Sequence, residues 1–290
     1  MVTDEKPGQC GQANPETLAD VWEAEIKARE HLEQIRHKLL VMSGKGGVGK
    51  STVAIYLALG LARRGCKVGL LDVDLHGPDI PRMLGLTGRL HMGPEGGIQP
   101  QSGRDNLKVV SIEGLLTDRD APVIWRGPMK HKAIRQFLGE VEWGRLDYLI
   151  IDSPPGTGDE PMSVAQVVAD ARAVIVTTPQ EVALADVRKA INFCRHVNLA
   201  VLGLVENMSG LICPHCGGEI YLFRQGGGRR TAAAMGIPFL GTLPFDLRVM
   251  EGGDLGLPLS ESPESSPFSR ALAALLDAVE AGCGEMGQEK

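Results

Sequence analysis

A glycine-rich segment at residues 43–52 constrains the fold of this 290-residue chain more than any other. It reads SGKGGVGKST, and from Gly44 to Ser51 it fits the pattern G-x-x-x-x-G-K followed by Ser or Thr, which is typical of a phosphate-binding loop. An apolar run precedes it and a helical pattern begins at Lys50, so the loop joins a strand to a helix. The glycines allow backbone N–H groups to turn inward at a helix N-terminus, where the helix dipole favours an anion. The segment therefore predicts a nucleoside triphosphate site on an α/β fold.

The loop combines a backbone cradle with side chains of defined chemistry. In this pattern Lys50 neutralises the β- and γ-phosphates, and the Ser51 hydroxyl ligates Mg²⁺. Lys45 is not required by the pattern, and on the loop alone it could equally be a solvated lysine. The predicted nucleotide-binding residues here are Gly44, Lys45, Gly46, Gly47, Val48, Gly49, Lys50, Ser51 and Thr52.

Apolar runs alternate with helical patterns through the rest of the chain. The predicted strands are 38–43, 67–72, 107–112, 146–151, 172–177, 200–205 and 238–242, and the predicted helices are 50–64, 129–140, 161–169, 183–196, 227–235 and 267–281. Strands this apolar on both faces are typical of a parallel sheet that is covered by helices. We therefore expect an α/β fold with a doubly wound, mostly parallel sheet and helices on both faces.

We expect one large domain between two short terminal segments. Residues 1–37 read as a polar tail and an amphipathic helix, 38–282 as the nucleotide-binding domain, and 283–290 as a disordered tail. With 43% hydrophobic residues, a chain of this length can bury one full α/β core. The Gly-, Pro- and Ser-rich stretches at 85–105 and 252–267 are predicted to be loops.

Composition and charge exclude several classes of function. The formal net charge of -6 argues against nucleic-acid binding, which needs a basic face. No apolar run reaches the roughly eighteen residues of a membrane span, and the N-terminus lacks a basic region followed by an apolar core. We therefore expect a cytoplasmic protein with no membrane partner.

Two predicted strands end in aspartates. Asp152 ends one of them, and in a doubly wound sheet this carboxylate emerges beside the phosphate-binding loop, where it can hold Mg²⁺. The other ends in Asp72-Val-Asp74, and the alternation of a strand places both carboxylates on one side. An aspartate at a strand end is also a common turn cap, so the position alone does not decide between the two roles.

The segment Cys213-Pro-His-Cys216 places two thiols three positions apart in a Gly- and Pro-rich turn. Two thiolates can bind one metal ion or one edge of an iron–sulfur cluster. A four-cysteine site needs two more ligands, and a second subunit across a two-fold axis would supply them. A zinc ion on the same thiolates, a dithiol redox pair and an inert pair are the alternatives. The other cysteines are predicted to be core or surface thiols (Cys66, Cys194) or to lie in the terminal segments (Cys10, Cys283).

Taken in order, these motifs resemble those of the Mrp/ApbC/Nbp-type iron–sulfur cluster carrier ATPases, within the deviant phosphate-loop group that includes MinD and ParA. The likeness runs from about residue 36 to about residue 260. It rests on Lys45 and Lys50, residues 72–78, residues 152–159 and residues 207–216. The resemblance implies a homodimer that binds ATP and Mg²⁺, holds a labile 4Fe–4S cluster between the two pairs of Cys213 and Cys216, and passes it to apo-proteins.

The resemblance also implies roles for single residues. Lys45 would reach the nucleotide of the partner subunit, Asp74 would orient or deprotonate the attacking water, and Asn207 would read adenine. The implied catalytic residues are Lys45, Lys50, Asp74 and Asp152; the Mg²⁺ residues are Ser51, Asp72 and Asp152; and the loop over the base or ribose includes Pro244 and Asp246. Asp79 departs from the serine expected in this family, and only Cys10 lies where eukaryotic members have a four-cysteine N-terminal site.

Other classes share parts of the pattern. A MinD- or ParA-like positioning or regulatory ATPase, with a structural zinc bridging the cysteine pairs, is the alternative. It would need a basic amphipathic C-terminal helix or a basic surface. Residues 268–280 contain one arginine and two acidic residues, so neither is evident. A nucleotide kinase would carry an arginine-rich lid, which is not apparent.

Overall fold

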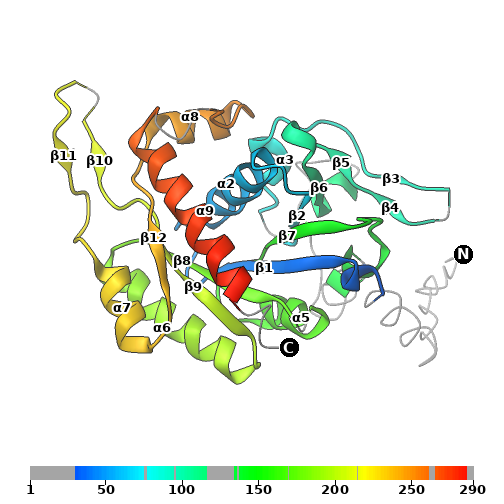
Figure 1. The fold of residues 1–290 in the computed structure, drawn as a ribbon, viewed down its shortest axis with the longest axis horizontal. Coiled ribbons are helices and arrows are strands. Elements are labelled where there is room, and N and C mark those ends of the chain that lie inside the picture. The colour runs from blue at the N-terminus through cyan, green and yellow to red at the C-terminus, as the bar shows by residue number, and fades with distance from the viewer. Residues whose placement is uncertain are drawn as a thin grey trace, which may run out of the picture.

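An eight-stranded sheet organises the chain (Figure 1). The computed structural model describes residues 30–74, 77–94, 96–115, 134–135, 137–168, 170–213, 215–260 and 265–285. The strand order is β12-β9-β8-β1-β7-β2-β6-β5, and every pairing is parallel except that of β5 with β6. Its strands are β1 (Ile35–Ser43), β2 (Val68–Asp72), β5 (Gln101–Ser102), β6 (Lys108–Ser111), β7 (Leu146–Asp152), β8 (Arg172–Thr177), β9 (Ala200–Glu206) and β12 (Phe239–Thr242). All the predicted strands are present, and the mostly parallel sheet is confirmed.

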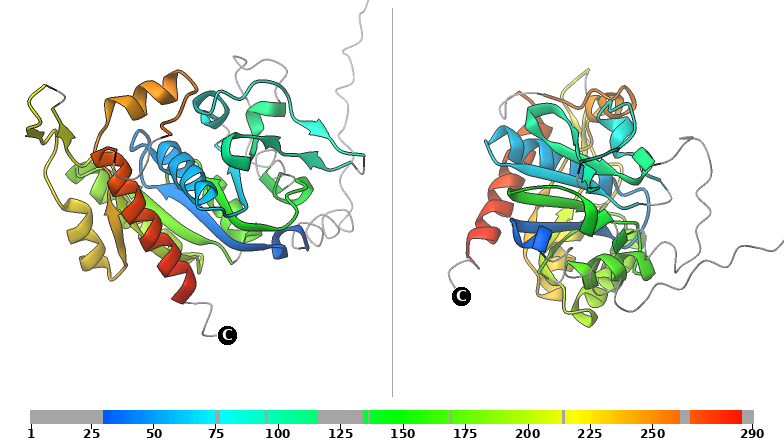
Figure 2. Two further views of the ribbon diagram at one scale, coloured as in Figure 1. Left: turned by 45° about the horizontal axis from the view of Figure 1, so that its top comes forward. Right: turned by 90° about the vertical axis from the view of Figure 1, so that its right-hand side faces the viewer.

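Helices cover both faces of this sheet (Figure 2). On one face lie α2 (Lys50–Arg63) and α9 (Pro267–Glu285), and on the other lie α5 (Asp159–Val167), α6 (Glu181–His196) and α7 (Gly227–Met235). Strand alternation explains the two cores: Leu39 and Val41 of β1 pack in one, and Leu40 and Met42 pack in the other. The doubly wound arrangement follows from strands that are apolar on both sides.

Several short elements are absent from the sequence predictions. They are helices α3 (Ile80–Met83) and α8 (Leu247–Asp254), the 3-10 turns at Arg104–Asn106 and Ile112–Leu115, and the strand pairs β3 (His91–Met92) with β4 (Ile98–Gln99) and β10 (Leu211–Ile212) with β11 (Glu219–Ile220). The predicted loop at 85–105 thus contains three strands of two residues each. Strands this short leave no alternation to detect.

Both predicted boundaries of the large domain shift. β1 begins at Ile35, three residues before the expected start at 38. α9 continues to Glu285, so the disordered tail predicted from residue 283 is wrong for 283–285. Cys283, which the sequence analysis places in that tail, is buried because it falls four residues after Val279 on the apolar stripe of α9. The predicted tail and most of the predicted helix before residue 30, the segment 129–133, His76 and residues 286–290 lie outside the described residues.

Within the described ranges, the helices include none that is long and apolar enough to cross a membrane.

Candidate functional site

The carboxyl ends of neighbouring strands bring the predicted aspartates together. In the register of the sheet, Asp72 at the end of β2 pairs with Asp152 at the end of β7 and with Ser111 at the end of β6. Asp72 and Asp152 are 0% and 1% exposed. Two carboxylates are therefore buried side by side at the edge where the phosphate-binding loop leaves β1.

Lys50 supplies the positive charge at this edge. It is the first residue of α2, and its buried Nζ lies 2.6 Å from Asp152 Oδ1 and 3.8 Å from Asp74 Oδ2. Three of the predicted catalytic residues thus meet around one ammonium group. An arriving phosphate would draw this ammonium away from the carboxylates, because both compete for the same charge.

Burial acts strongly on the two innermost carboxyl groups. It raises the pKa of Asp72 well above its usual range. The neighbouring Asp152 raises this pKa further, and Lys50 lowers it. It also raises the pKa of Asp152, again against the lowering effect of Lys50. The site therefore depends on a cation to keep these groups ionised.

The carboxylate oxygens of Asp72 both have hydrogen-bond partners, whereas one oxygen of Asp152 has none in the described part of the chain. Asp72 Oδ2 accepts a hydrogen bond from Ser111 Oγ at 3.0 Å, and its Oδ1 accepts one from the Asp74 N–H at 3.1 Å. Asp152 Oδ2 is buried and has no hydrogen-bond partner in the described part of the chain. Carboxylate and hydroxyl oxygens are the ligands that Mg²⁺ prefers, so Asp152 and Ser51 fit this ion directly, and Asp72 fits a supporting role.

The phosphate-binding loop has the backbone that the sequence predicts. Gly47 and Gly49 adopt φ values of 78° and 79°, in the left-handed region that favours glycine. Gly44 packs so closely on α6 that a Cβ there would overlap the backbone of Asp186. Lys45 is exposed. The Ser43 carbonyl accepts a hydrogen bond from the Gly156 N–H at 2.8 Å, which ties the turn after β7 to the loop.

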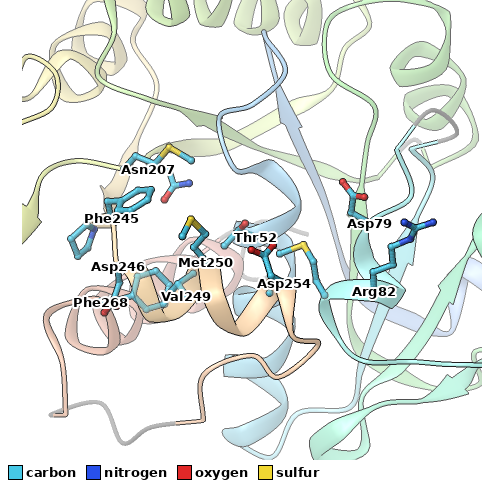
Figure 3. Close-up of a pocket in the computed structure, with 14 residues that line it drawn as sticks. Thr52, Asp79, Arg82, Asn207, Phe245, Asp246, Val249, Met250, Asp254 and Phe268 are labelled. Carbon is cyan, nitrogen blue, oxygen red and sulfur yellow. The ribbon is translucent and has the colours of Figure 1, made fainter.

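A cavity of about 500 Å³ opens beside the start of α2 (Figure 3). Thr52 lines one side, and Asn207, Pro244 and Asp246 line another, so the residues predicted to surround the base lie together. Met208 and Phe245, which lie inside the predicted segments, also line it. The lining further includes side chains absent from the predictions, which are the apolar Met83, Val249, Met250 and Phe268 and the charged Arg82 and Asp254. These unpredicted side chains come from α3, α8 and α9, which only the tertiary fold brings together, and no local motif marks them. This apolar lining suits a planar base.

Asn207 and Asp246 are both already engaged. The Asn207 Nδ2 donates to the Val48 carbonyl at 2.9 Å, so this amide holds the phosphate-binding loop. Asp246 accepts from the Arg248 N–H at 3.0 Å, which caps α8, and forms a 2.7 Å ion pair with the same arginine. A ribose hydroxyl at Asp246 would compete with this ion pair.

Asp79 also lines the cavity, where the family resemblance predicts a serine. Burial and the nearby Asp74 raise the pKa of its carboxyl group. Nothing in the structure requires a carboxylate at this position, so the departure from serine has no structural explanation.

Replacing Asn207 by alanine is expected to weaken nucleotide binding about ten-fold, since a hydrogen bond that orders the loop and one wall of the cavity are both lost. Titration calorimetry with ADP measures the change. Asn192→Ala is the matched control, because the Asn192 side chain is exposed on α6, where its Oδ1 accepts a hydrogen bond from Arg195. Equal affinities of the Asn207→Ala variant and the wild type would show that this amide does not support the site.

The predicted cysteine pair lies on the hairpin of β10 and β11, which we call the cysteine hairpin (residues 211–220). It projects from the body of the molecule (Figure 1). Cys213 is half-buried and Cys216 is exposed. Hydrogen bonds from the backbone N–H groups of Cys216 and His215 lower the pKa of the Cys213 thiol. The turn thereby favours the thiolate, which is the form that binds metal.

The cysteine hairpin offers two ligands and an apolar surface. Among the described residues, no group of three or more His, Cys, Asp and Glu side chains could hold a metal ion. The hairpin and the residues after it expose four large hydrophobic side chains, Ile212, Ile220, Tyr221 and Leu222. Exposed apolar side chains that gather in one place are typical of an interaction surface.

The loop between β1 and α2, with buried aspartates at the ends of β2 and β7, defines a P-loop NTPase. The family described as NUBPL iron-transfer P-loop NTPase, of the ParA group, matches residues 34–280. The chain belongs to this family, which confirms the resemblance seen in the motifs.

Known proteins are similar over most of the chain. The iron-sulfur cluster carrier protein of Methanocaldococcus jannaschii is 44% identical over 96% of this chain and 97% of its own length. The cytosolic Fe-S cluster assembly factor CFD1 of Eremothecium gossypii is 52% identical over 77% of this chain and 82% of its own. A solved nucleotide-binding protein from Archaeoglobus fulgidus, in complex with ADP, has a TM-score of 0.73 at 42% identity and covers 85% of this chain and 95% of its own. The cell division ATPase MinD of Pyrococcus furiosus shares the fold, with a TM-score of 0.61 at 24% identity over 85% of this chain and 99% of its own.

Proposed function

We propose that this protein is an ATP-dependent iron–sulfur cluster carrier. Two copies would hold a 4Fe–4S cluster between their Cys213 and Cys216 pairs and pass it to apo-proteins in the cytoplasm. The observation that carries the proposal is the thiolate-favouring cysteine pair on a hairpin that begins a few residues after Asn207 of the nucleotide site. The names of the archaeal and fungal relatives support the same cargo.

The number of ligands supports a dimer. A 4Fe–4S cluster is held by about four thiolates, and the cysteine hairpin provides Cys213 and Cys216. A two-fold axis through the hairpins would duplicate the pair and bury the exposed Ile212, Ile220 and Tyr221 at the same time. One symmetric contact would thus complete the ligand set and cover the apolar surface.

The nucleotide site supports ATP hydrolysis. Lys50 and the N–H groups of the loop would bind the phosphates, and Asp152 with Ser51 would hold Mg²⁺, which neutralises charge on the phosphates when bound. Asp74 Oδ2, 3.8 Å from Lys50 Nζ, would orient the attacking water and accept its proton. Asp72 would support Asp74 through the hydrogen bond from the Asp74 N–H.

Transfer of the cluster is a ligand exchange. Each thiol of the recipient that binds iron loses a proton, and each Cys213 or Cys216 thiolate that leaves iron gains one. The iron and sulfide atoms keep their oxidation states, so the step needs no electron donor.

Anaerobic reconstitution with iron and sulfide tests the proposal. We expect about four iron and four sulfide per two chains, with a broad visible absorbance that passes to the recipient when apo-recipient is added and the two proteins are then separated. The zinc alternative predicts instead about one zinc per two chains after purification without air, and no uptake of iron when zinc is present. Protein that takes up neither iron nor sulfide would rule out the carrier.

Lys45→Ala is expected to leave ATP binding within about two-fold of wild type and to lower ATP turnover at least about ten-fold, because the exposed Lys45 would act on the partner's nucleotide. Titration with ATP and phosphate release measure the two effects. Full turnover in this variant would contradict a role for Lys45 across the dimer.

A further inference from the structure

Glu206 is a buried carboxylate that the proposed chemistry leaves without a role. It ends β9 and is 0% exposed. Its Oε1 accepts a hydrogen bond from Ser209 Oγ at 2.6 Å, and its Oε2 accepts one from the Gly228 N–H at 2.5 Å. Ser209 lies just before the cysteine hairpin, and Gly228 lies after it at the start of α7. One carboxylate therefore joins the two chain segments from which the hairpin extends.

The fit around Glu206 is close. A Cβ at Gly228 would lie 3.0 Å from Glu206 Cβ and 3.0 Å from its Oε2, so the helix can approach the carboxylate because residue 228 is a glycine. Burial of a carboxylate is unfavourable unless its oxygens are hydrogen-bonded, and here each oxygen has its own donor. The arrangement fixes the position of Ser209 relative to α7, and with it the base of the cysteine hairpin.

The next residue in the chain connects to the nucleotide site. Asn207 Nδ2 donates to the Val48 carbonyl of the phosphate-binding loop at 2.9 Å. Successive residues of an extended chain point to opposite sides, so Glu206 and Asn207 direct their side chains to different parts of the molecule. The end of β9 thus holds the phosphate-binding loop with one side chain and the base of the cysteine hairpin with the other.

Main-chain hydrogen bonds make a second connection. The Leu243 N–H donates to the Glu206 carbonyl at 2.8 Å, the Ser209 N–H to the Leu243 carbonyl at 2.9 Å, and the Phe245 N–H to the Gly210 carbonyl at 2.7 Å. Phe245 lines the cavity of the nucleotide site. The segment that forms the cavity wall and the segment that enters the hairpin are therefore bonded side by side.

We propose that Glu206 is a positioning residue that couples the nucleotide state to the hold on the cluster. Movement of the phosphate-binding loop or of the cavity wall would shift the end of β9, and Glu206 would carry that shift to Ser209 and Gly228. The angle of the cysteine hairpin, and thus the approach of the two cysteine pairs, would change with it. This inference rests on the proposed carrier function.

Cluster transfer with and without ATP tests the inference. The protein is loaded anaerobically, and transfer to an apo-ferredoxin is followed by absorbance. In the wild type we expect ATP to change the rate at least about five-fold, and in Ser209→Ala we expect less than about two-fold, with ADP affinity of the unloaded protein unchanged. Ser209→Thr keeps a hydroxyl and should restore the response. Asn192→Ala, at an exposed position of α6 where the side chain bonds to Arg195, removes a polar group outside the cysteine hairpin and should keep the full response.

A second variant and a second measurement show whether a lost response comes from Glu206 or from general unfolding of Ser209→Ala. Gly228→Ala keeps Ser209 but displaces Glu206, and it should lose the ATP response in the same way. By thermodynamic reciprocity, cluster loading should change the Kd for ATP in the wild type and not in Ser209→Ala. An ATP response in Ser209→Ala and Gly228→Ala as large as in the wild type overturns the inference, as does a wild type whose transfer ignores ATP. Failure of the wild type to take up a cluster overturns instead the carrier function.

Discussion

Replacing Cys213 and Cys216 together by serine is expected to reduce iron and sulfide uptake to less than about a tenth of the wild-type amount, because their thiolates are the proposed ligands of the cluster. The backbone hydrogen bonds of the turn remain, but a serine hydroxyl does not ionise near neutral pH and binds iron weakly. Metal and sulfide content after anaerobic reconstitution measures the effect. ADP affinity should stay within about two-fold of wild type, since neither cysteine lines the cavity.

The matched control is Cys66→Ser. Cys66 is half-buried at the other end of α2, and burial raises the pKa of its thiol, so it is a poor ligand. This variant should load a full cluster. The double variant should also fail to show the cluster-dependent shift from monomer to dimer in sedimentation velocity. Full loading of the double variant would mean that the cargo binds elsewhere.

The nucleotide site was predictable from sequence because its key side chains sit in local patterns. Lys50 and Ser51 occupy fixed places in the phosphate-binding loop, and Asp72 and Asp152 end strands whose apolar runs are unmistakable. Parallel strands end at one edge of a sheet, so placing these aspartates near the loop required only the topology.

Other parts of the site depend on contacts between distant segments. Val249 and Met250 reach the cavity from α8, a helix absent from the sequence predictions, and no periodicity in their neighbourhood indicates that they line a site with Thr52. Glu206 reads as the end of an apolar strand, and its two partners lie on either side of the cysteine hairpin. Cys283 falls in the tail predicted to be disordered from residue 283, whereas α9 continues to Glu285 and the spacing of Cys283 from Val279 buries it.

The sequence also does not predict that the apolar side chains of the cysteine hairpin are exposed. Ile212 and Ile220 look like ordinary strand residues, and only the two-residue strands of the hairpin leave them uncovered. In the proposed dimer, their position next to the thiols would connect dimer formation to cluster binding. Loss of the cluster would then weaken the dimer, and a weakened dimer would release the cluster, since the two equilibria share one interface.

Lys50→Ala is expected to lower ATP affinity at least about 100-fold, equivalent to about 3 kcal/mol, because the ammonium group that neutralises the phosphates is lost. Titration calorimetry with ATP measures the change. Lys45→Ala is the matched control, since it removes the same group from an exposed position five residues earlier in the same loop. Cluster loading of the Lys50→Ala variant should persist, because the ion-pair partners of Lys50 are Asp74 and Asp152, which lie outside the cysteine hairpin. Unchanged ATP affinity would refute the assignment of the phosphate-binding loop.

The same substitution should also change the pH dependence of stability. Burial already raises the pKa of Asp72 and Asp152 in the folded protein, and Lys50 opposes this. Without Lys50 both pKa values rise further, while those of the unfolded chain stay at about 3.9. A carboxyl group with a raised folded-state pKa destabilises the fold when it must ionise, so the penalty is absent below about pH 4 and grows as the pH rises through the folded-state pKa. We therefore expect the urea midpoint of Lys50→Ala to fall further below that of wild type at pH 8 than at pH 5.5. An equal difference at both pH values would show that Lys50 does not hold these carboxylates in their ionised form.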